Sequence, residues 1–233
     1  TMGRPEHLLQ VIKDLAEQEL LPKNVIVVEQ DPDPQAVTAL KELVEGIWPF
    51  KVIHHFIHQT GACNARNLAL KEVTSNWVFF CDDDNRIQDY VLKMALTEMK
   101  KYGISGLNTA YRQKDEKVIF HYVKQWGTFG SGNSFVSANM LKEVSFSPIF
   151  EHGYGEDADF GMQLRHVGCD IIYHPNIEIV HLKAPMGGFR QNPPREWEKE
   201  IPLPKPSPTV MALALKYYTP EQFKGFKIAV FLK

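Results

Sequence analysis

The stretch NWVFFCDDDNRI, residues 76–87, runs an apolar segment directly into three consecutive aspartates. The apolar part, residues 76–81, is typical of a buried β-strand. Asp82, Asp83 and Asp84 follow at the end of that strand, where like charges repel and desolvation makes the repulsion worse. We therefore expect a positive group among them. Asp82 and Asp84 also have D-x-D spacing, which puts two carboxylates on one face of an extended chain.

Strands and helices alternate around this segment up to residue 103. Helices are predicted for residues 4–20, 34–46, 61–73 and 88–103, and strands for residues 24–31, 50–56 and 76–81. This alternation is typical of a parallel sheet with helices on its faces.

Beyond residue 103 the pattern changes to strands separated by turns. Strands are predicted for residues 103–112, 117–126, 128–137, 170–174 and 177–182, and a helix for residues 156–168. Residues 186–209 are rich in Pro, Gly and charge, so we interpret them as a long loop, a lid or an ordered excursion over the surface. Two short helices are expected in residues 208–233, the second beginning at Thr219 and Pro220.

Composition narrows the class of protein. The 233 residues are 44% hydrophobic and carry a net charge of −2, which is typical of a globular protein with a sizeable core. This balance gives no basic footprint for general nucleic-acid binding. Cys63, Cys81 and Cys169 form no CxxC pair, which argues against a disulfide framework and predicts a reducing, cytoplasmic compartment.

The aspartate run is the strongest candidate for a binding site. In an open α/β sheet, ligands bind beyond the carboxyl ends of the strands, which is where residues 82–85 lie. A solvated turn with helix-capping aspartates is the plainer interpretation. Three acids after a very apolar strand instead favour Mg²⁺ or Mn²⁺, hard cations that prefer oxygen ligands and bring phosphates with them.

Other candidate residues have a structural and a functional interpretation. Glu156 and Asp157 either cap a helix or supply a general base near the metal. His181 ends an apolar strand, as a structural residue or a further ligand. Arg66 with the amides of its helix would suit a diphosphate, or it is an ordinary exposed arginine. The histidines of residues 54–58 are interpreted as part of a strand.

The ordered set TMGRP, VIVVEQD, GACNARNLAL, VFFCDDDN, GSGNSFVS, GYGEDADFGMQL and IVHL resembles the family-2 glycosyltransferases of the GT-A fold over about residues 1–185. The resemblance implies a mixed, mostly parallel α/β sheet flanked by helices, with a nucleotide-binding half at about 1–103 and an acceptor-side half at about 104–185. Residues 186–233 would be a loop or lid and C-terminal helices packed on the same domain. It also implies transfer of a sugar from a nucleotide diphosphate to an acceptor hydroxyl, with inversion and a divalent metal.

The same resemblance implies roles for individual residues. Asp84 would bind Mn²⁺ or Mg²⁺, with Asp82 and His181 as further ligands and Asp83 near the ribose. Asp157 would be the catalytic base and Glu156 would support it. The residues implied to contact the donor or its sugar are Thr1, Arg4, Glu29, Gln30, Arg66, Asp82, Asp83, Gly132 and Asn133.

The sequence departs from the family pattern at positions that would recognise the nucleobase of the donor. Gly3 stands where an aromatic residue often stacks on the base, and Glu29 and Gln30 stand where paired aspartates are usual, so UDP is expected from family habit alone. Family members usually have an apolar strand before the first loop, so we expect about ten further residues before Thr1 in the natural polypeptide.

Three functions are compared on this basis. The leading one is a UDP-sugar transferase that acts on a saccharide or lipid-linked saccharide in polysaccharide or glycolipid synthesis. The alternatives are a nucleotidyltransferase of similar sheet layout and a non-catalytic module that binds Ca²⁺ or carbohydrate. The aromatic residues of 207–233 either pack on the core or form a peripheral membrane contact.

Overall fold

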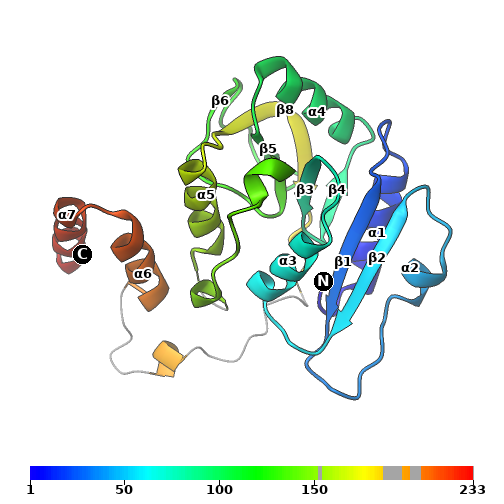
Figure 1. Cartoon of the computed structure of the whole chain (residues 1–233), viewed down its shortest axis with the longest axis horizontal. Helices are drawn as coiled ribbons and strands as arrows, with labels where there is room; N and C mark the ends of the chain where they lie inside the picture. Colours follow the sequence, from blue (N-terminus) through cyan, green and yellow to red (C-terminus); the bar gives the residue numbers. More distant parts are fainter. Residues whose placement is uncertain (152–153, 186–195, 200–205, 233) are drawn as a thin grey trace.

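A computed structural model describes residues 1–151, 154–185, 196–199 and 206–232. Figure 1 shows a central sheet with helices on either side, and two further helices at the C-terminal end of the chain. The predicted lid, residues 186–209, lies largely outside the described residues. In the part of the chain that is described, no helix is both long and apolar enough to cross a membrane.

The elements follow one another as mixed helices and strands. The α-helices are α1 (Pro5–Ala16), α2 (Lys41–Glu45), α3 (Ala62–Lys71), α4 (Val91–Tyr102), α5 (Glu156–His166), α6 (Pro208–Tyr217) and α7 (Pro220–Phe231). The strands are β1 (Asn24–Gln30), β2 (Lys51–Ile57), β3 (Trp77–Cys81), β4 (Asn85–Ile87), β5 (Gly106–Arg112), β6 (Lys124–Gln125), β7 (Asn133–Ser137) and β8 (Ile171–His181). Short 3₁₀ turns are η1 (Ala138–Leu141), η2 (Pro148–Phe150) and η4 (Glu196–Lys199).

The strands form two sheets. β1 and β2 pair in parallel, and the larger sheet has the order β3-β7-β5-β8-β4, with β6 paired to β8. β3 and β4 therefore lie at the two ends of this order although only residues 82–84 separate them in the chain. Three extended residues reach about 10 to 14 Å at most, so the larger sheet must curve until its ends meet at the aspartates.

The mixed α/β class is confirmed, but the share of parallel pairing is smaller than expected. β1–β2 and β5–β8 are parallel, whereas the β3–β7, β5–β7, β4–β8 and β6–β8 pairs are antiparallel. The alternating pattern predicted a mostly parallel sheet because it could not show that later strands insert between earlier ones. β7, for example, separates β3 from β5.

Most predicted elements are confirmed, and three differ. Only Lys41–Glu45 of the predicted helix 34–46 is helical, and only Lys124–Gln125 of the predicted strand 117–126 pairs. The two strands predicted for 170–174 and 177–182 are one strand, β8, whose pairing with β5 shifts register between Thr109 and Ala110.

Two apolar clusters hold these layers together. The first joins α1 and α4 to the sheet, and α1 contributes Leu8, Val11, Ile12 and Leu15. The second includes residues of α5 and contains four phenylalanines, with Phe146 stacked on Phe160 at 4.1 Å between centroids. The helix carrying Glu156 and Asp157 is therefore held in place by tightly packed aromatic side chains.

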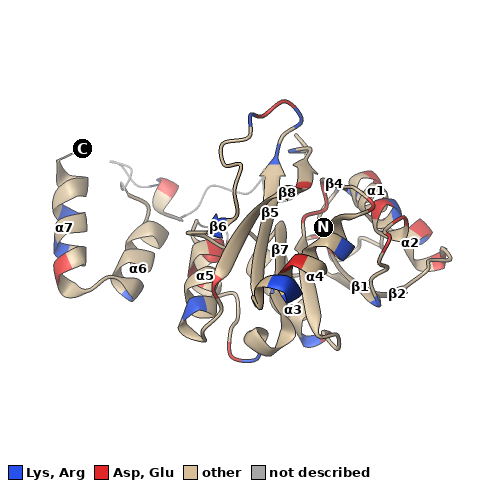
Figure 2. Cartoon of the chain, turned by 90° about the horizontal axis from the view of Figure 1, so that it is seen from above, with Lys and Arg blue, Asp and Glu red and all other residues tan. Residues whose placement is uncertain are grey.

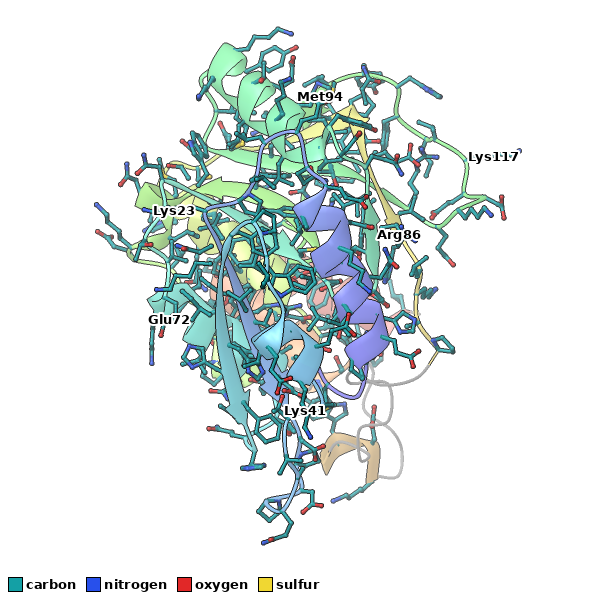
Figure 3. All side chains as sticks on the ribbon, turned by 90° about the vertical axis from the view of Figure 1, so that its right-hand side faces the viewer. Lys23, Lys41, Glu72, Arg86, Met94 and Lys117 are labelled. Carbon is teal, nitrogen blue, oxygen red and sulfur yellow. The ribbon has the colours of Figure 1, made fainter. Side chains whose placement is uncertain are left out.

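Polar contacts between elements also fix the region around the aspartates. Arg86 of β4, labelled in Figure 3 beside α1, donates to the buried Asp14 carboxylate at 2.8 Å, and the Ile87 amide donates to the same oxygen. α1 is thereby fastened to the strand that follows the aspartates. Figure 2 shows α6 next to α5, with α7 beyond it, and basic and acidic residues interspersed over the molecule.

Candidate active site

Three predicted metal ligands converge where β3 and β8 end. One ligand atom from each of Asp82, Asp84 and His181 lies within 4.8 Å of the others, and His181 Nε2 is 3.4 Å from Asp84 Oδ1. Asp84 is buried, and Asp82 and His181 are partly buried. Two carboxylate oxygens and one imidazole nitrogen form a donor set that fits Mn²⁺, or Mg²⁺ with water and phosphate oxygens as its remaining ligands.

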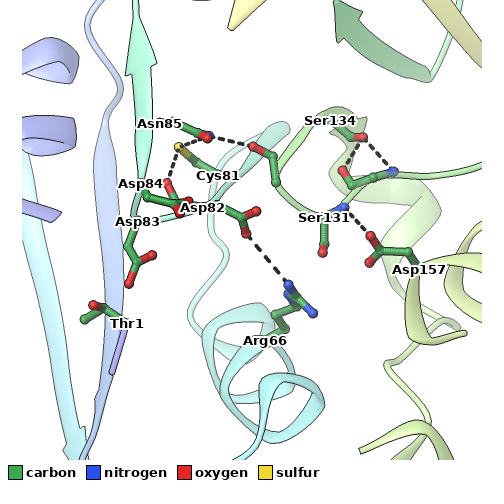
Figure 4. A network of polar contacts seen from close by, with 12 residues as sticks. Thr1, Arg66, Cys81, Asp82, Asp83, Asp84, Asn85, Ser131, Ser134 and Asp157 are labelled. Atoms are coloured by element: carbon green, nitrogen blue, oxygen red, sulfur yellow. Dashed lines mark hydrogen bonds and ion pairs between the residues drawn. The ribbon is translucent and has the colours of Figure 1, made fainter. Parts of the chain in front are cut away.

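The positive groups expected beside the aspartates are present as arginines from two other elements. Arg4, just before α1, places Nη1 2.9 Å from Asp83 Oδ1 and 3.5 Å from Asp84 Oδ2. Arg66 of α3 places Nη2 3.8 Å from Asp82 Oδ1, as Figure 4 shows. Guanidinium groups therefore stabilise the aspartate run before any ligand is considered.

Tyr111 and Asn85 support the aspartates, and the sequence analysis missed both. The Tyr111 hydroxyl lies 3.1 Å from Asp82 Oδ2 and 2.9 Å from Asn85 Oδ1, and its ring stacks on His181 at 4.7 Å. Asn85 Nδ2 donates to the Gly132 carbonyl at 2.7 Å. The available signals were the position of Tyr111 near the end of a predicted strand and the asparagine that follows the aspartates.

Unpaired polar atoms mark the space in front of this cluster. Six buried side-chain atoms of the described residues have no hydrogen-bond partner, and three of them, Thr1 Oγ1, Arg66 Nη1 and Asp157 Oδ1, belong to predicted site residues. The other carboxylate oxygen of Asp157 accepts from the Ser131 amide at 3.2 Å. Figure 4 shows Thr1, Arg66 and Asp157 arranged around Asp82. Because buried polar groups nearly always have partners, this grouping is typical of a ligand site.

Glu29, which was predicted to contact the nucleobase of the donor, forms hydrogen bonds with other residues of the protein. Its buried carboxylate accepts from the Thr38 hydroxyl and, at 2.8 Å, from the Ala39 amide. His54 Nε2 lies 2.9 Å from the same carboxylate. The contacts hold residues 38–39 in a non-helical conformation, and base recognition by Glu29 stays a prediction.

Gln30 and Asn133 have similar internal roles. The Gln30 amide donates to the Gln59 and Gly61 carbonyls and accepts from the Gly61 amide, which fixes the loop before α3. Asn133 Nδ2 donates to the Thr109 carbonyl at 3.0 Å. Both side chains are buried, so they shape the site through the backbone that they hold.

The N-terminus of α3 is occupied by a carboxylate from another part of the chain. The amides of Cys63 and Asn64 donate to the two Glu151 carboxylate oxygens at 3.0 and 2.8 Å. A Cβ at Gly61 would lie 2.5 Å from that carboxyl group, and Gly61 has φ 145°. The expectation that these amides bind a diphosphate is therefore wrong. Arg66 remains as the residue of α3 that is predicted to contact the diphosphate.

Burial and charge shift the pKa values of the acids here. Desolvation raises the pKa of Asp82, with the charges of Asp157 and Asp84 adding to the effect and Arg66 opposing it. The pKa of Glu156 is also raised, first by burial and then by the adjacent Asp157. Burial raises the pKa of the Tyr111 hydroxyl, and the charges of Asp82 and Asp84 add to this rise, so the hydroxyl keeps its proton and stays a hydrogen-bond donor. A divalent cation would relieve this excess of negative charge.

Comparison with known proteins identifies the family. The sequence model of glycosyl transferase family 2 matches residues 1–146, more than half of the chain. The chain belongs to glycosyl transferase family 2. This membership favours a glycosyltransferase over the nucleotidyltransferase and the non-catalytic module. Comparison with curated proteins gives no significant match.

Solved structures similar to this family member include those of S. aureus TarS. The TarS 1–349 structure with UDP has a TM-score of 0.64 at 19% identity and covers 76% of this chain and 56% of that chain. The structure with UDP-GlcNAc has a TM-score of 0.58 at 19% identity, covering 77% and 57%. TarS itself gives 0.60 at 19% identity, covering 73% and 33%. The chain thus spans between a third and somewhat over half of these proteins.

Proposed function

We propose that this glycosyltransferase transfers a sugar from UDP to an acceptor hydroxyl, with a divalent metal and with inversion at the anomeric carbon. The observation that carries the proposal is the grouping of unpaired buried atoms of Thr1, Arg66 and Asp157 around the Asp82–Asp84–His181 cluster. The choice of UDP is supported by the similar fold of TarS, which has been crystallised with UDP and UDP-GlcNAc.

Asp82, Asp84 and His181 would hold Mn²⁺ or Mg²⁺ against the donor diphosphate. When bound, the cation would neutralise negative charge on the departing diphosphate. Arg66 would add a guanidinium donor, because its Nη1 is buried without a partner. Arg4 holds Asp83 and Asp84 in place from the loop before α1.

Asp157 is proposed as the catalytic base. Its Oδ2 is held by the Ser131 amide, which leaves Oδ1 to accept the proton of the acceptor hydroxyl. The deprotonated acceptor oxygen then forms a bond to the anomeric carbon as the bond to the diphosphate breaks, from the opposite face of the sugar. Glu156 is adjacent on the helix and cannot point at the same hydroxyl, so it is given a supporting role.

Two isosteric variants test the donor site and the base separately. We expect Asp157→Asn to slow transfer by about 10²- to 10⁴-fold while UDP affinity with Mn²⁺ stays unchanged. Asp84→Asn should remove the Mn²⁺-dependent part of UDP affinity in calorimetry. The exposed Asp89→Asn is the matched control and should behave as wild type. Wild-type transfer by Asp157→Asn, with loss in Glu156→Gln, would assign the base to Glu156 instead.

The acceptor and the location are part of the same proposal. We place the enzyme in the cytoplasm, making a polysaccharide or glycolipid from a saccharide or lipid-linked saccharide acceptor. Residues 1–185 are proposed as the catalytic domain. α7 exposes Ile228, Phe231 and Leu232 beside lysines, and this face is the proposed peripheral membrane contact.

A further inference from the structure

Asp159 is a buried carboxylate on the helix that carries the proposed base, and the proposed mechanism gives it no role. It lies two residues after Asp157 and its side chain is 0% exposed. An ionised carboxylate is costly to bury unless charged and hydrogen-bonding partners surround it. The partners of Asp159 therefore indicate what this position does.

Most of those partners come from the C-terminal helix α6. Lys216 Nζ lies 2.6 Å from Asp159 Oδ1, and the Tyr217 hydroxyl lies 2.8 Å from the same oxygen and 3.1 Å from the Asp159 carbonyl. Gln163, one turn along α5, donates to the other carboxylate oxygen at 2.7 Å. Two adjacent residues at the end of α6 thus converge on one oxygen atom, which specifies a single placement of α6.

The beginning of α6 holds the residues just before the base. The Tyr154 amide donates to the buried Thr209 hydroxyl at 3.2 Å. Thr209 and Lys216 are seven residues apart on α6, which is about 10 Å along a helix axis. α6 therefore contacts the chain on both sides of Glu156 and Asp157, and Figures 1 and 2 both show it beside α5.

We propose that Lys216 and Tyr217 are positioning residues that act through Asp159 to hold Asp157 in its catalytic place, so that α6 is a working part of the active site. The proposal rests on the assignment of Asp157 as the base. Ser131 holds one side of the Asp157 carboxylate. Lys216 and Tyr217 contact Asp159 and so fix the turn of α5 that also carries Asp157. A displacement of about 1 Å at such a group costs on the order of 10² in rate.

Three variants of α6 test this role. Tyr217→Phe removes one hydroxyl, and we expect it to lower kcat by about 10-fold with the donor KM unchanged. Lys216→Met should lower kcat by about 10- to 10²-fold, and Lys216→Arg should recover most of the loss because it keeps the charge. UDP affinity in the presence of Mn²⁺ should be that of wild type in all three.

Matched controls remove similar groups elsewhere. Lys93→Met breaks an exposed ion pair of 2.7 Å with Glu19, and Tyr102→Phe alters the last residue of α4. Both should transfer at the wild-type rate. If Lys216→Met does not fold, Tyr217→Phe alone decides.

A double variant separates positioning from general stabilisation. If Tyr217 acts through Asp157, the Tyr217→Phe change should have little further effect on kcat in an Asp157→Asn background, because the positioned group is already lost. Equal effects in both backgrounds, or wild-type kcat for folded Tyr217→Phe and Lys216→Met, would overturn the inference. Wild-type transfer by Asp157→Asn would instead show that the proposed base is wrong, so the two failures are distinguishable.

Discussion

Gly132 faces the proposed metal ligands so closely that the smallest side chain should disturb them. A Cβ at this position would lie 2.3 Å from Asp82 Oδ2, 2.7 Å from Asp82 Cγ and 2.9 Å from the Tyr111 hydroxyl oxygen. Ordinary contacts begin at 3.4 Å, so in Gly132→Ala the Asp82 carboxylate must move by about 1 Å. Mg²⁺ tolerates little deviation from its metal–oxygen distance of about 2.0 to 2.1 Å, so such a movement removes Asp82 as a ligand.

The expected effect on function is much larger than the effect on folding. The atoms that must move are the ends of side chains, and the main loss to the fold is one hydrogen bond, worth about 1 kcal/mol. Metal-dependent UDP affinity should fall by about 10- to 100-fold, in line with losses of metal-site geometry. Transfer should fall by at least about 10², the usual result of a 1 Å misplacement.

Calorimetric titration of UDP with and without Mn²⁺, together with thermal unfolding, measures both effects. Gly127→Ala is the control, because it lies in the same loop and its added Cβ would meet no atom within 4 Å. In an Asp82→Ala background only the 2.9 Å contact with the Tyr111 hydroxyl is left, so Gly132→Ala should then cost less than it does in the wild type. Wild-type metal-dependent affinity in the single Gly132→Ala variant would refute the placement of Asp82 at the metal.

Two further properties are predicted from other parts of the molecule. Burial lowers the pKa of His174, which faces Glu98 and Lys101 of α4, so the native state resists protonation and stability should fall as pH drops through the ordinary value of 6.5. Melting temperatures between about pH 7.5 and about pH 5.5 should change less in His174→Gln than in wild type, and an equal change would contradict the assignment. For α7, we expect sedimentation with phosphatidylglycerol-containing vesicles but not with pure phosphatidylcholine, and a weaker effect in Phe231→Ser; no sedimentation with either would contradict the proposed membrane contact.

Local patterns in the sequence predicted the parts of the fold that local physics determines. The strand before the aspartates, the amphipathic α1 and the left-handed Gly103 that ends α4 were all predictable, because periodicity and capping decide them. The helix at 34–46 was mostly wrong because a distant residue decides there. The Glu29 carboxylate accepts hydrogen bonds from the Thr38 hydroxyl and the Ala39 amide. In a longer helix the Ala39 amide would instead donate to the carbonyl four residues earlier.

Strand pairing was harder to predict than strand existence. Residues 117–123 have strand-forming side chains, yet Ile119 and Tyr122 are exposed, and pairing with β8 begins only after them, at Lys124–Gln125. Pro175 lies between the two strands predicted for residues 170–174 and 177–182. The single strand β8 instead accommodates it at a register shift opposite Thr109 and Ala110, a feature of the pair of strands that neither sequence segment reveals.

The candidate site divides in the same way. The place of Asp82 and Asp84 was predictable because ligands bind beyond the carboxyl ends of strands. His181 was expected as a further ligand only from the family resemblance, and a metal role for the three residues stays a prediction. The partners that shape the site come from far along the chain, as with Tyr111 at Asp82, Glu151 at the start of α3, and Lys216 at Asp159. Each is a common residue type, and apart from the position of Tyr111 near a strand end no local pattern points to it, so the folded arrangement is needed to identify these contacts.

The charge balance of the finished site supports metal dependence independently of the ligand geometry. Among the described residues, Asp82, Asp83 and Asp84 face the guanidinium groups of Arg4 and Arg66, and Asp157 adds a further carboxylate, so the acids outnumber the arginines there. A nucleotide diphosphate is itself an anion and would be repelled by that excess. A divalent cation would offset that excess and attract the diphosphate. The same aspartates that the arginines hold in place would therefore make donor binding depend on the metal.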